Sequence, residues 1–239
     1  MRTFGLQTYT VRKLIKEDLD FTLHELKSMK LTTLECARMP IDQMSINSLK
    51  KYRMKVISLQ LTLNKIQRKY NEILHFCKET GNNNVVISVL PIWARIPLIG
   101  PRLFTSKVNK LSSKYQKEGI RICFHHHAYE MKKTQKNFYL DRYLKNLHPH
   151  VGLIIDTYWI TLMGQDPLDI YKRYIDRVQG IHLRDYQKSG QDIEIGQGTI
   201  DFKTFIQKLN TNVYTVIEQN AKDPLISIQQ SLNYLEENI

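Results

Sequence analysis

The stretch GIRICFHHHAYE, residues 119–130, joins an apolar run to a cluster of ionisable side chains. Its segment RICFHH, at 121–126, has the length and the hydrophobic content of a buried β-strand. Three histidines stand in a row at the end of the run, and a carboxylate follows three residues after the last of them. We interpret the stretch as a strand that is buried along its length and that presents reactive groups where it ends.

Strand-length runs of the same kind recur on both sides of this stretch, and they are rich in Val and Ile. The other seven are FGLQTY at 4–9, TTLEC at 32–36, KVISLQL at 55–61, NVVISVL at 84–90, VGLIID at 151–156, VQGIHLR at 178–184 and VYTVIEQ at 213–219.

The longer segments between these runs have helical spacing. Two apolar stripes are made by Phe21, Leu23, Leu26 and Met29 and by Ile66, Tyr70, Ile73, Leu74 and Cys77. Asp18 and Asp201 are predicted N-caps, and Gly81 and Gly119 stand where helices are expected to end.

Eight strands that each precede a helical segment predict a parallel sheet. Eight such units in 239 residues match a closed (β/α)8 TIM barrel, which typically takes about 250 residues. The alternative is an open doubly wound sheet, which usually has a glycine-rich first turn for a nucleotide. The first strand here leads into QTYTVRK instead. We therefore expect one TIM-barrel domain over residues 1–239.

Composition and charge narrow the functional classes. The chain carries 35 Lys and Arg against 23 Asp and Glu, a net charge of +12, but the lysines are spread along the sequence, which does not favour a nucleic-acid partner. The apolar runs are too short to cross a bilayer, and the first residues lack the apolar core of a signal peptide. Cys36, Cys77 and Cys123 are widely spaced in apolar context. We therefore expect reduced cysteines in a cytoplasmic protein that does not contact a membrane.

Polar and ionisable residues stand at the same end of nearly every predicted strand. A buried carboxylate costs several kcal/mol unless it is paired or bound to a metal, so such a ring indicates a site. Its members are Gln7, Tyr9, Glu35, Gln60, His125, His126, His127, Glu130, Asp156, His182, Arg184 and Glu218.

Four members of this ring, Glu130, Asp156, His182 and Glu218, form a ligand set for one divalent ion of Mn, Mg, Co or Zn. Such an ion polarises the carbonyl of a hydroxy-ketone and stabilises an enediolate. Carboxylates on opposite sides can then remove and return a proton at the neighbouring carbon.

The chain resembles the sugar isomerase/epimerase proteins, whose fold is the xylose isomerase-like TIM barrel. The resemblance is nearly end to end. FGLQTYTVR is similar to the opening strand of the family, and FHHHAYE resembles its His-Asn-His-x-x-Glu element. Later elements follow in the same order: DTYWITLMGQDP, GIHLRD, GQGTIDF and VIEQN.

The resemblance implies that Glu130, Asp156, His182 and Glu218 bind the metal and that Glu130 and Glu218 are also the acid/base pair. His127 is implied as a polar group on the substrate or as a base itself. The histidine run leaves the strand-five ligand open, because His125 or His127 can take the place of Glu130. His126, Arg184 and Gln197 depart from the Asn, Lys and Glu of the family pattern.

The expected substrate is a small sugar or keto-sugar, without a phosphate because no phosphate-binding glycine loop is present. The expected substrate contacts are Gln7, Tyr9, Glu35, Gln60, His125, Trp159 and Arg184. For Glu35 the alternative is a rim ion pair with Arg38. The apolar stretch VLPIWARIPLIGPRLF, at 89–104, is a lid over the site or a contact of a homodimer.

The predicted function is that of a metal-dependent sugar isomerase or epimerase. The same site would serve a dehydratase or lyase of a keto-sugar or keto-inositol. A nucleic-acid enzyme like the apurinic-site endonucleases is disfavoured. Those enzymes resemble a three-zinc design, which needs many more metal ligands than the ends of these strands offer. A non-catalytic sugar-binding member of the family is the remaining alternative.

Overall fold

Eight parallel strands form a closed barrel in the computed structural model, which describes residues 2–239. Their order around the barrel is β1-β12-β9-β8-β5-β4-β3-β2, and β1 pairs with β12 to close it. The barrel strands are β1 (Phe4–Gln7), β2 (Thr33–Ala37), β3 (Lys55–Leu61), β4 (Asn84–Ile87), β5 (Arg121–His125), β8 (Gly152–Asp156), β9 (Val178–Leu183) and β12 (Tyr214–Ile217). All eight strand predictions, and the predicted barrel, are confirmed.

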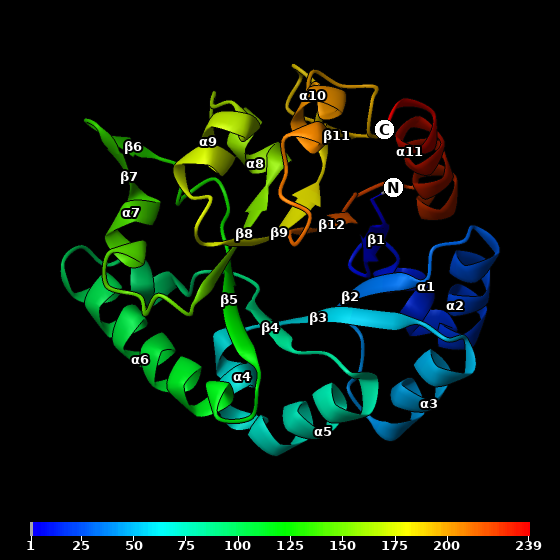
Figure 1. The fold of residues 1–239 in the computed structure, drawn as a ribbon, viewed down its shortest axis with the longest axis horizontal. Helices are drawn as coiled ribbons and strands as arrows, with labels where there is room; N and C mark the ends of the chain where they lie inside the picture. The colour runs from blue at the N-terminus through cyan, green and yellow to red at the C-terminus, as the bar shows by residue number, and fades with distance from the viewer. Residues whose placement is uncertain (1) are drawn as a thin grey trace.

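Helices cover the outside of the barrel, as Figure 1 shows for α2, α3, α5 and α6. The helices are α1 (Arg12–Glu17), α2 (Leu19–Ser28), α3 (Gln43–Lys51), α4 (Leu63–Arg68), α5 (Tyr70–Thr80), η1 (Ile92–Arg95), α6 (Ile99–Gln116), α7 (Tyr139–Leu144), α8 (Thr157–Leu162), α9 (Pro167–Arg173), α10 (Phe202–Gln207) and α11 (Pro224–Asn238). Two small antiparallel ribbons lie outside the barrel: β6 (Lys133–Thr134) with β7 (Asn137–Phe138), and β10 (Asp185–Tyr186) with β11 (Asp192–Ile193).

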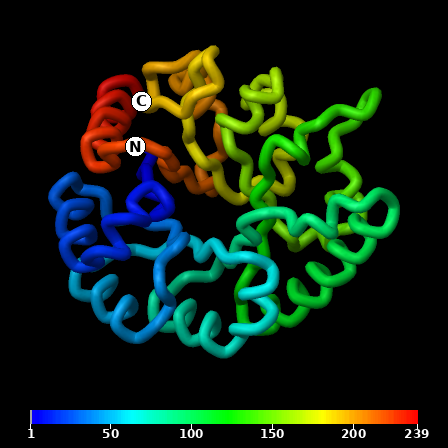
Figure 2. The backbone as a smooth tube through the Cα atoms, turned by 180° about the vertical axis from the view of Figure 1, so that it is seen from behind, coloured from blue at the N-terminus to red at the C-terminus, as the bar shows by residue number. Residues whose placement is uncertain are grey.

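The first and last parts of the chain meet at the point where the barrel closes, and the backbone trace shows them side by side (Figure 2). The guanidinium of Arg2 donates to the carbonyls of Leu209, Asn210 and Val213, just before β12. This contact fixes the segment before β1 to the loop that leads into its partner strand.

The predicted caps explain where several helices begin and end. The Asp18 carboxylate accepts from the Phe21 N–H at the start of α2, and Asp201 accepts from the Thr204 N–H at the start of α10. Gly81 ends α5 in the left-handed region, with φ of 68°, a conformation that glycine adopts without a steric penalty. These predictions are confirmed.

The helical stripes were predicted less well. The stripe at 66–77 is divided between α4 and α5, because the chain breaks at Lys69 and starts a second helix. In α2, Leu23 and Leu26 are buried, but Phe21 is 50% exposed in the first turn, where it faces away from the barrel.

The hydrophobic core has two parts. A large cluster fills the space between the barrel and its helices, and a small one of Val86, Cys123 and Ile154, with Tyr214 against it, fills the barrel interior. Cys36, Cys77 and Cys123 are buried and unpaired, as expected. Within residues 2–239, none of the helices combines the length and the hydropathy that a membrane span needs.

Candidate metal centre and substrate cavity

Four ionisable side chains converge at the carboxyl ends of neighbouring strands. His125 ends β5, Asp156 ends β8, His182 lies near the end of β9, and Glu218 follows β12. Each offers one ligand atom, and these atoms all lie within 4.8 Å of one another. The four strands are consecutive around the barrel, and Asp156 pairs in register with His182. Parallel strands therefore bring residues that are far apart in sequence to one buried point.

His182 is held at both nitrogens of its ring. Nε2 lies 2.7 Å from Oε1 of Glu35, and Nδ1 lies 2.7 Å from Oε2 of Glu218. Burial alone would lower the pKa of His182, but the two carboxylates, Glu35 foremost, raise it to about 10. Nδ1 is thus the nitrogen that faces the cluster, while Nε2 is used to orient the ring.

Glu35 contacts His182 at the ring nitrogen that faces away from the cluster, and it is fully buried. The hydroxyl of Tyr214 donates to Oε2 of Glu35 at 2.9 Å, and the hydroxyl of Ser58 donates to the same oxygen. Burial raises the pKa of Glu35, but the charge of His182 outweighs burial and the pKa is lowered. A carboxylate that accepts from the outer nitrogen of a ligand histidine fixes its ring orientation and raises its basicity.

Asp156 has a different use for each of its oxygens. Oδ1 accepts from the N–H groups of Tyr158 and Trp159 and caps α8. Oδ2 lies 3.5 Å from Nε2 of His125 and 3.2 Å from Nη1 of Arg184. Asp156 therefore caps a helix and belongs to the cluster at the same time.

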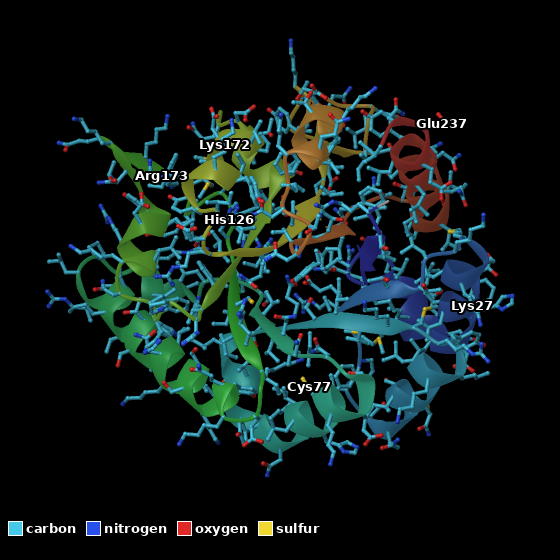
Figure 3. The ribbon with its side chains drawn as sticks, in the orientation of Figure 1. Lys27, Cys77, His126, Lys172, Arg173 and Glu237 are labelled. Atoms are coloured by element: carbon cyan, nitrogen blue, oxygen red, sulfur yellow. The ribbon has the colours of Figure 1, made fainter. Side chains whose placement is uncertain are left out.

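His125, the last residue of β5, and His126, just after it, point in different directions. Nδ1 of His125 faces the carbonyl of Ser88 at 3.4 Å, so this nitrogen is the donor and Nε2 is left for the site. His126 lies near the middle of the view in Figure 3 and is fully buried. Its Nε2 accepts from the Asp156 N–H at 3.2 Å. Burial, with the nearby charge of His125, lowers the pKa of His126 to about 3, so its ring stays neutral in this contact.

Arg184 bridges the carboxylates of the cluster. Its Nη1 lies 3.2 Å from Asp156 and 3.3 Å from Glu218, and its Nη2 lies 2.5 Å from Asp192 on β11. Burial raises the pKa of Asp192 to about 6 even with Arg184 beside it. The guanidinium therefore connects the buried cluster to the β10–β11 ribbon.

The cluster fits a divalent cation by its donor chemistry. Two imidazoles and two carboxylates suit Zn, Mn, Co or Mg. Nε2 of His125 is buried and has no hydrogen-bond partner within residues 2–239. Buried polar atoms without a partner are costly, and a bound cation would satisfy this nitrogen.

Glu130 lies outside this group, and His125 takes the strand-five position. After β5 the chain turns, and the Glu130 N–H donates to the carbonyl of His127 at 3.2 Å. Oε2 of Glu130 accepts from the His127 N–H at 2.7 Å, so the carboxylate folds back onto its own turn. Burial raises the pKa of Glu130. In the cluster, the place expected for Glu130 is taken by His125, one of the alternatives that the histidine run left open.

A cavity of about 900 Å³ opens beside the cluster. Such a volume is in the range of small-molecule sites. Of the residues that sequence analysis expected to contact the substrate, all but Glu35 line it. The lining includes Gln7, Tyr9, Gln60, His125, His127, Trp159, Arg184 and Glu218. Glu35 contacts Nε2 of His182 instead of the cavity. It does not form the ion pair with Arg38 that was the alternative for this residue.

Several lining residues were not found from the sequence. Arg38, Lys65, Tyr158, Asp192 and Asn220 also face the cavity. Lys65 lies on a helix beyond β3 and Asp192 lies on a ribbon, so the search for polar strand ends passed over both. Only Arg38 carried a signal, as a polar residue directly after a strand.

The stretch at 89–104 is partly ordered into helices. It forms η1 and the start of α6, and Ser88 and Val89 line the cavity. Ile92 and Leu98 are both 83% exposed. The choice between a lid and a dimer contact remains a prediction.

These features define a class of protein, a parallel (β/α)8 barrel with a buried cluster of potential metal ligands at the carboxyl ends of its strands. The sequence matches the model of the xylose isomerase-like TIM barrel family over residues 65–238, which is more than half of the chain. The chain therefore belongs to this family.

Individual relatives agree with this assignment. The inosose dehydratase of Lacticaseibacillus casei is 28% identical over 138 residues, which are 49% of this chain and 46% of that enzyme. The chain thus aligns with about half the length of this relative. A sugar phosphate isomerase/epimerase from Parabacteroides distasonis has a TM-score of 0.80 at 19% identity, covering 99% of this chain and 98% of that one.

A third relative is a structure of the IOLI protein with a bound zinc atom. Its TM-score is 0.71 at 16% identity, and the match covers 99% of this chain and 97% of that chain. At these identities the two structural matches show a common fold.

Proposed function

We propose that the protein is a divalent-metal-dependent isomerase or epimerase of a small sugar or keto-sugar. The reaction removes a proton from the carbon next to a carbonyl and returns it. The observation that supports this most is the buried cluster of His125, Asp156, His182 and Glu218, two of which line a cavity of about 900 Å³.

These four residues would hold one ion of Mn, Mg, Co or Zn. When bound, such an ion polarises a substrate carbonyl and stabilises the negative charge that forms as the neighbouring proton leaves. Glu35 keeps Nδ1 of His182 turned toward the cluster, and the Ser88 carbonyl does the same for Nε2 of His125.

We assign the proton transfer to two side chains on the cavity wall, His127 and Glu218, both of which are unprotonated. Burial, followed by the charge of His125, lowers the pKa of His127 to about 3, so its ring is neutral. Its Nδ1 has no hydrogen-bond partner within residues 2–239 and can accept a proton. Burial raises the pKa of Glu218, but Arg184 and His182 outweigh it and lower the pKa to about 2, so this carboxylate is ionised. Glu130 then acts indirectly, by fixing the backbone of His127.

The remaining lining residues would orient the sugar. Nε2 of Gln7 donates to Oε1 of Gln60 at 3.0 Å, so the two amides are held as one polar surface for hydroxyl groups. The ring of Trp159 lies 5.5 Å from that of His127 and offers an apolar face for the sugar carbons.

A dehydratase of a keto-inositol or keto-sugar is the second candidate. The similarity to inosose dehydratase favours it. It begins with the same proton removal, after which the hydroxyl on the adjacent carbon leaves as water with a proton from the enzyme. The cluster and the proton acceptors serve either outcome.

Elemental analysis of the purified protein tests the metal. We expect about one equivalent per chain, and much less in a Glu218→Gln variant, which keeps the shape of the side chain but removes its charge. No metal after incubation with Mn would contradict the proposal. Near three equivalents of zinc would indicate a nucleic-acid enzyme instead, although the structure contains one four-residue cluster within residues 2–239.

Turnover is tested by incubating the metal-loaded protein with keto-sugars and inososes in D2O. Deuterium incorporated into unchanged or isomerised sugar supports isomerase or epimerase chemistry. Loss of water from the substrate supports the dehydratase. If fully metal-loaded protein neither incorporates deuterium into any of these substrates nor removes water from them, a binding protein would be favoured.

A further inference from the structure

The cavity has two sides with different chemistry. The cluster lies on β5, β8, β9 and β12, which are consecutive in the barrel, whereas β2 and β3 lie in the other half. Arg38 directly follows β2, and Lys65 lies on α4 after β3. Both line the cavity. Because β2 pairs with β3, the two cations follow neighbouring strands, and both lie on the side of the barrel opposite the cluster.

The charges on the cluster side are balanced, and those on the opposite rim are not. Arg184 is paired with Asp156, Glu218 and Asp192. The acidic residues that line the cavity are Asp192 and Glu218, both of which pair with Arg184. Within residues 2–239, Arg38 and Lys65 form no ion pair. The β2–β3 rim therefore carries two positive charges without a counter-ion from the protein.

The backbone at Arg38 is held in one conformation, and the side chain is exposed. Its φ is 56°, in the left-handed region, which is strained for a residue with a side chain. Lys30 and Arg53 have similar angles, but each comes just after the end of a helix, where that conformation is common. Arg38 instead follows a strand. The Thr8 hydroxyl accepts from the Ala37 N–H at 2.7 Å and donates to the Ala37 carbonyl at 2.6 Å, which fixes the residue before it.

Unpaired surface cations are common in a chain with 35 basic residues. Arg38 and Lys65 differ from most of them in three ways. They share one cavity, they follow adjacent strands, and the backbone at Arg38 is held in the left-handed region. An anionic group on the ligand would supply the missing counter-charge, and Arg is suited to hold it with two hydrogen bonds.

We propose that Arg38 and Lys65 form an anion subsite that binds a carboxylate or phosphate at the end of the substrate opposite its carbonyl. The inference rests on the proposed function, and it narrows the substrate class to an acidic or phosphorylated keto-sugar. It replaces the expectation of an unphosphorylated sugar, which was based only on the lack of a glycine loop. Two side chains that follow separate strands can bind the same anion without such a loop.

The first test compares three ligands that share one keto group and differ at the far carbon. D-fructose is neutral there, D-fructose 6-phosphate carries a phosphate, and D-fructuronate carries a carboxylate. Calorimetry is done with metal-loaded protein. We expect at least one acidic ligand to bind about tenfold more tightly than D-fructose. Which of the two does so decides between phosphate and carboxylate.

The variant Arg38→Gln/Lys65→Gln should bring the three affinities within about twofold of one another. The matched control is Arg102→Gln/Lys110→Gln, which removes the same charges from exposed positions on α6 that do not line the cavity. The control should keep the preference of the wild type, since general charge is screened over such separations. A preference that survives in the first variant, or that is lost in both, overturns the proposal.

Should none of the three sugars bind, inorganic phosphate decides the matter. We expect the wild type to bind phosphate about tenfold more tightly than Arg38→Gln/Lys65→Gln does. Equal affinities, or no binding to the wild type, would refute the subsite. Metal content separates this failure from failure of the proposed function, because both double variants should retain the wild-type amount of metal.

Discussion

His182 is the most constrained of the candidate ligands, because both of its ring nitrogens are in contact with carboxylates. Glu35 holds the outer nitrogen and is itself held by Ser58 and Tyr214. The orientation of one imidazole therefore depends on a chain of polar contacts that extends into the barrel interior.

The variant Glu35→Gln tests this dependence. Loss of a carboxylate behind a ligand histidine typically weakens metal affinity by about 10- to 100-fold, and we expect a change in that range, measured by competition with a chelator. Tyr214→Phe removes one of three donors to Glu35 and should have a smaller effect. Unchanged affinity in Glu35→Gln would mean that the ring is held by packing alone.

The identity of the strand-five ligand is a second question at this scale. We expect His125→Ala to lose most of its bound metal and Glu130→Gln to keep it, because only His125 is near the other three ligands. Elemental analysis after dialysis measures both. Gln still accepts from the His127 N–H, so Glu130→Gln is a mild change. The reverse result would restore Glu130 as the ligand.

Helix caps can be compared within this one chain. Asp18 accepts from a backbone N–H of α2, whereas Asp223 stands before α11 without a side-chain cap bond. Asp18→Ala should lower the free energy of unfolding by about 1 kcal/mol. Asp223→Ala should change it by much less. Urea denaturation measures both, and equal losses would show that the cap bond is not the cause.

The elements were predictable because their signals are local. A strand such as Lys55–Leu61 can be recognised from its seven consecutive residues, and a cap such as Asp18 acts within one helical turn. The break at Lys69 was missed because one apolar stripe runs through both helices.

Part of the site was predicted because its signals are also local. Asp156, His182 and Glu218 stand at strand ends, so the barrel alone indicates that they converge. The direction of a side chain after a strand depends on the turn, as Glu130 demonstrates by folding back onto His127. Lys65 and Asp192 reach the cavity from a helix and a ribbon, and such positions follow from tertiary packing only.

At the scale of the whole molecule, burial of the three cysteines has a measurable result. Burial raises the pKa of Cys77 and Cys123 to about 12 and also raises that of Cys36. The thiolate is the reactive form, so a thiol reagent at pH 8 should label none of them rapidly in the native protein. In urea it should label all three. Rapid native labelling would reveal local opening around α5 or the barrel interior.

Closure of the barrel between β1 and β12 has a consequence for the order of folding. Glu218 reaches the other three ligands when β12 pairs with β9, but Glu35, which orients His182, comes from β2 and reaches that ring only when the ends of the barrel have met. Contacts between distant parts of a chain are slow to form. Tight metal capture during refolding would therefore report closure of the barrel, because His182 is fixed as a ligand only after its support from β2 is in place.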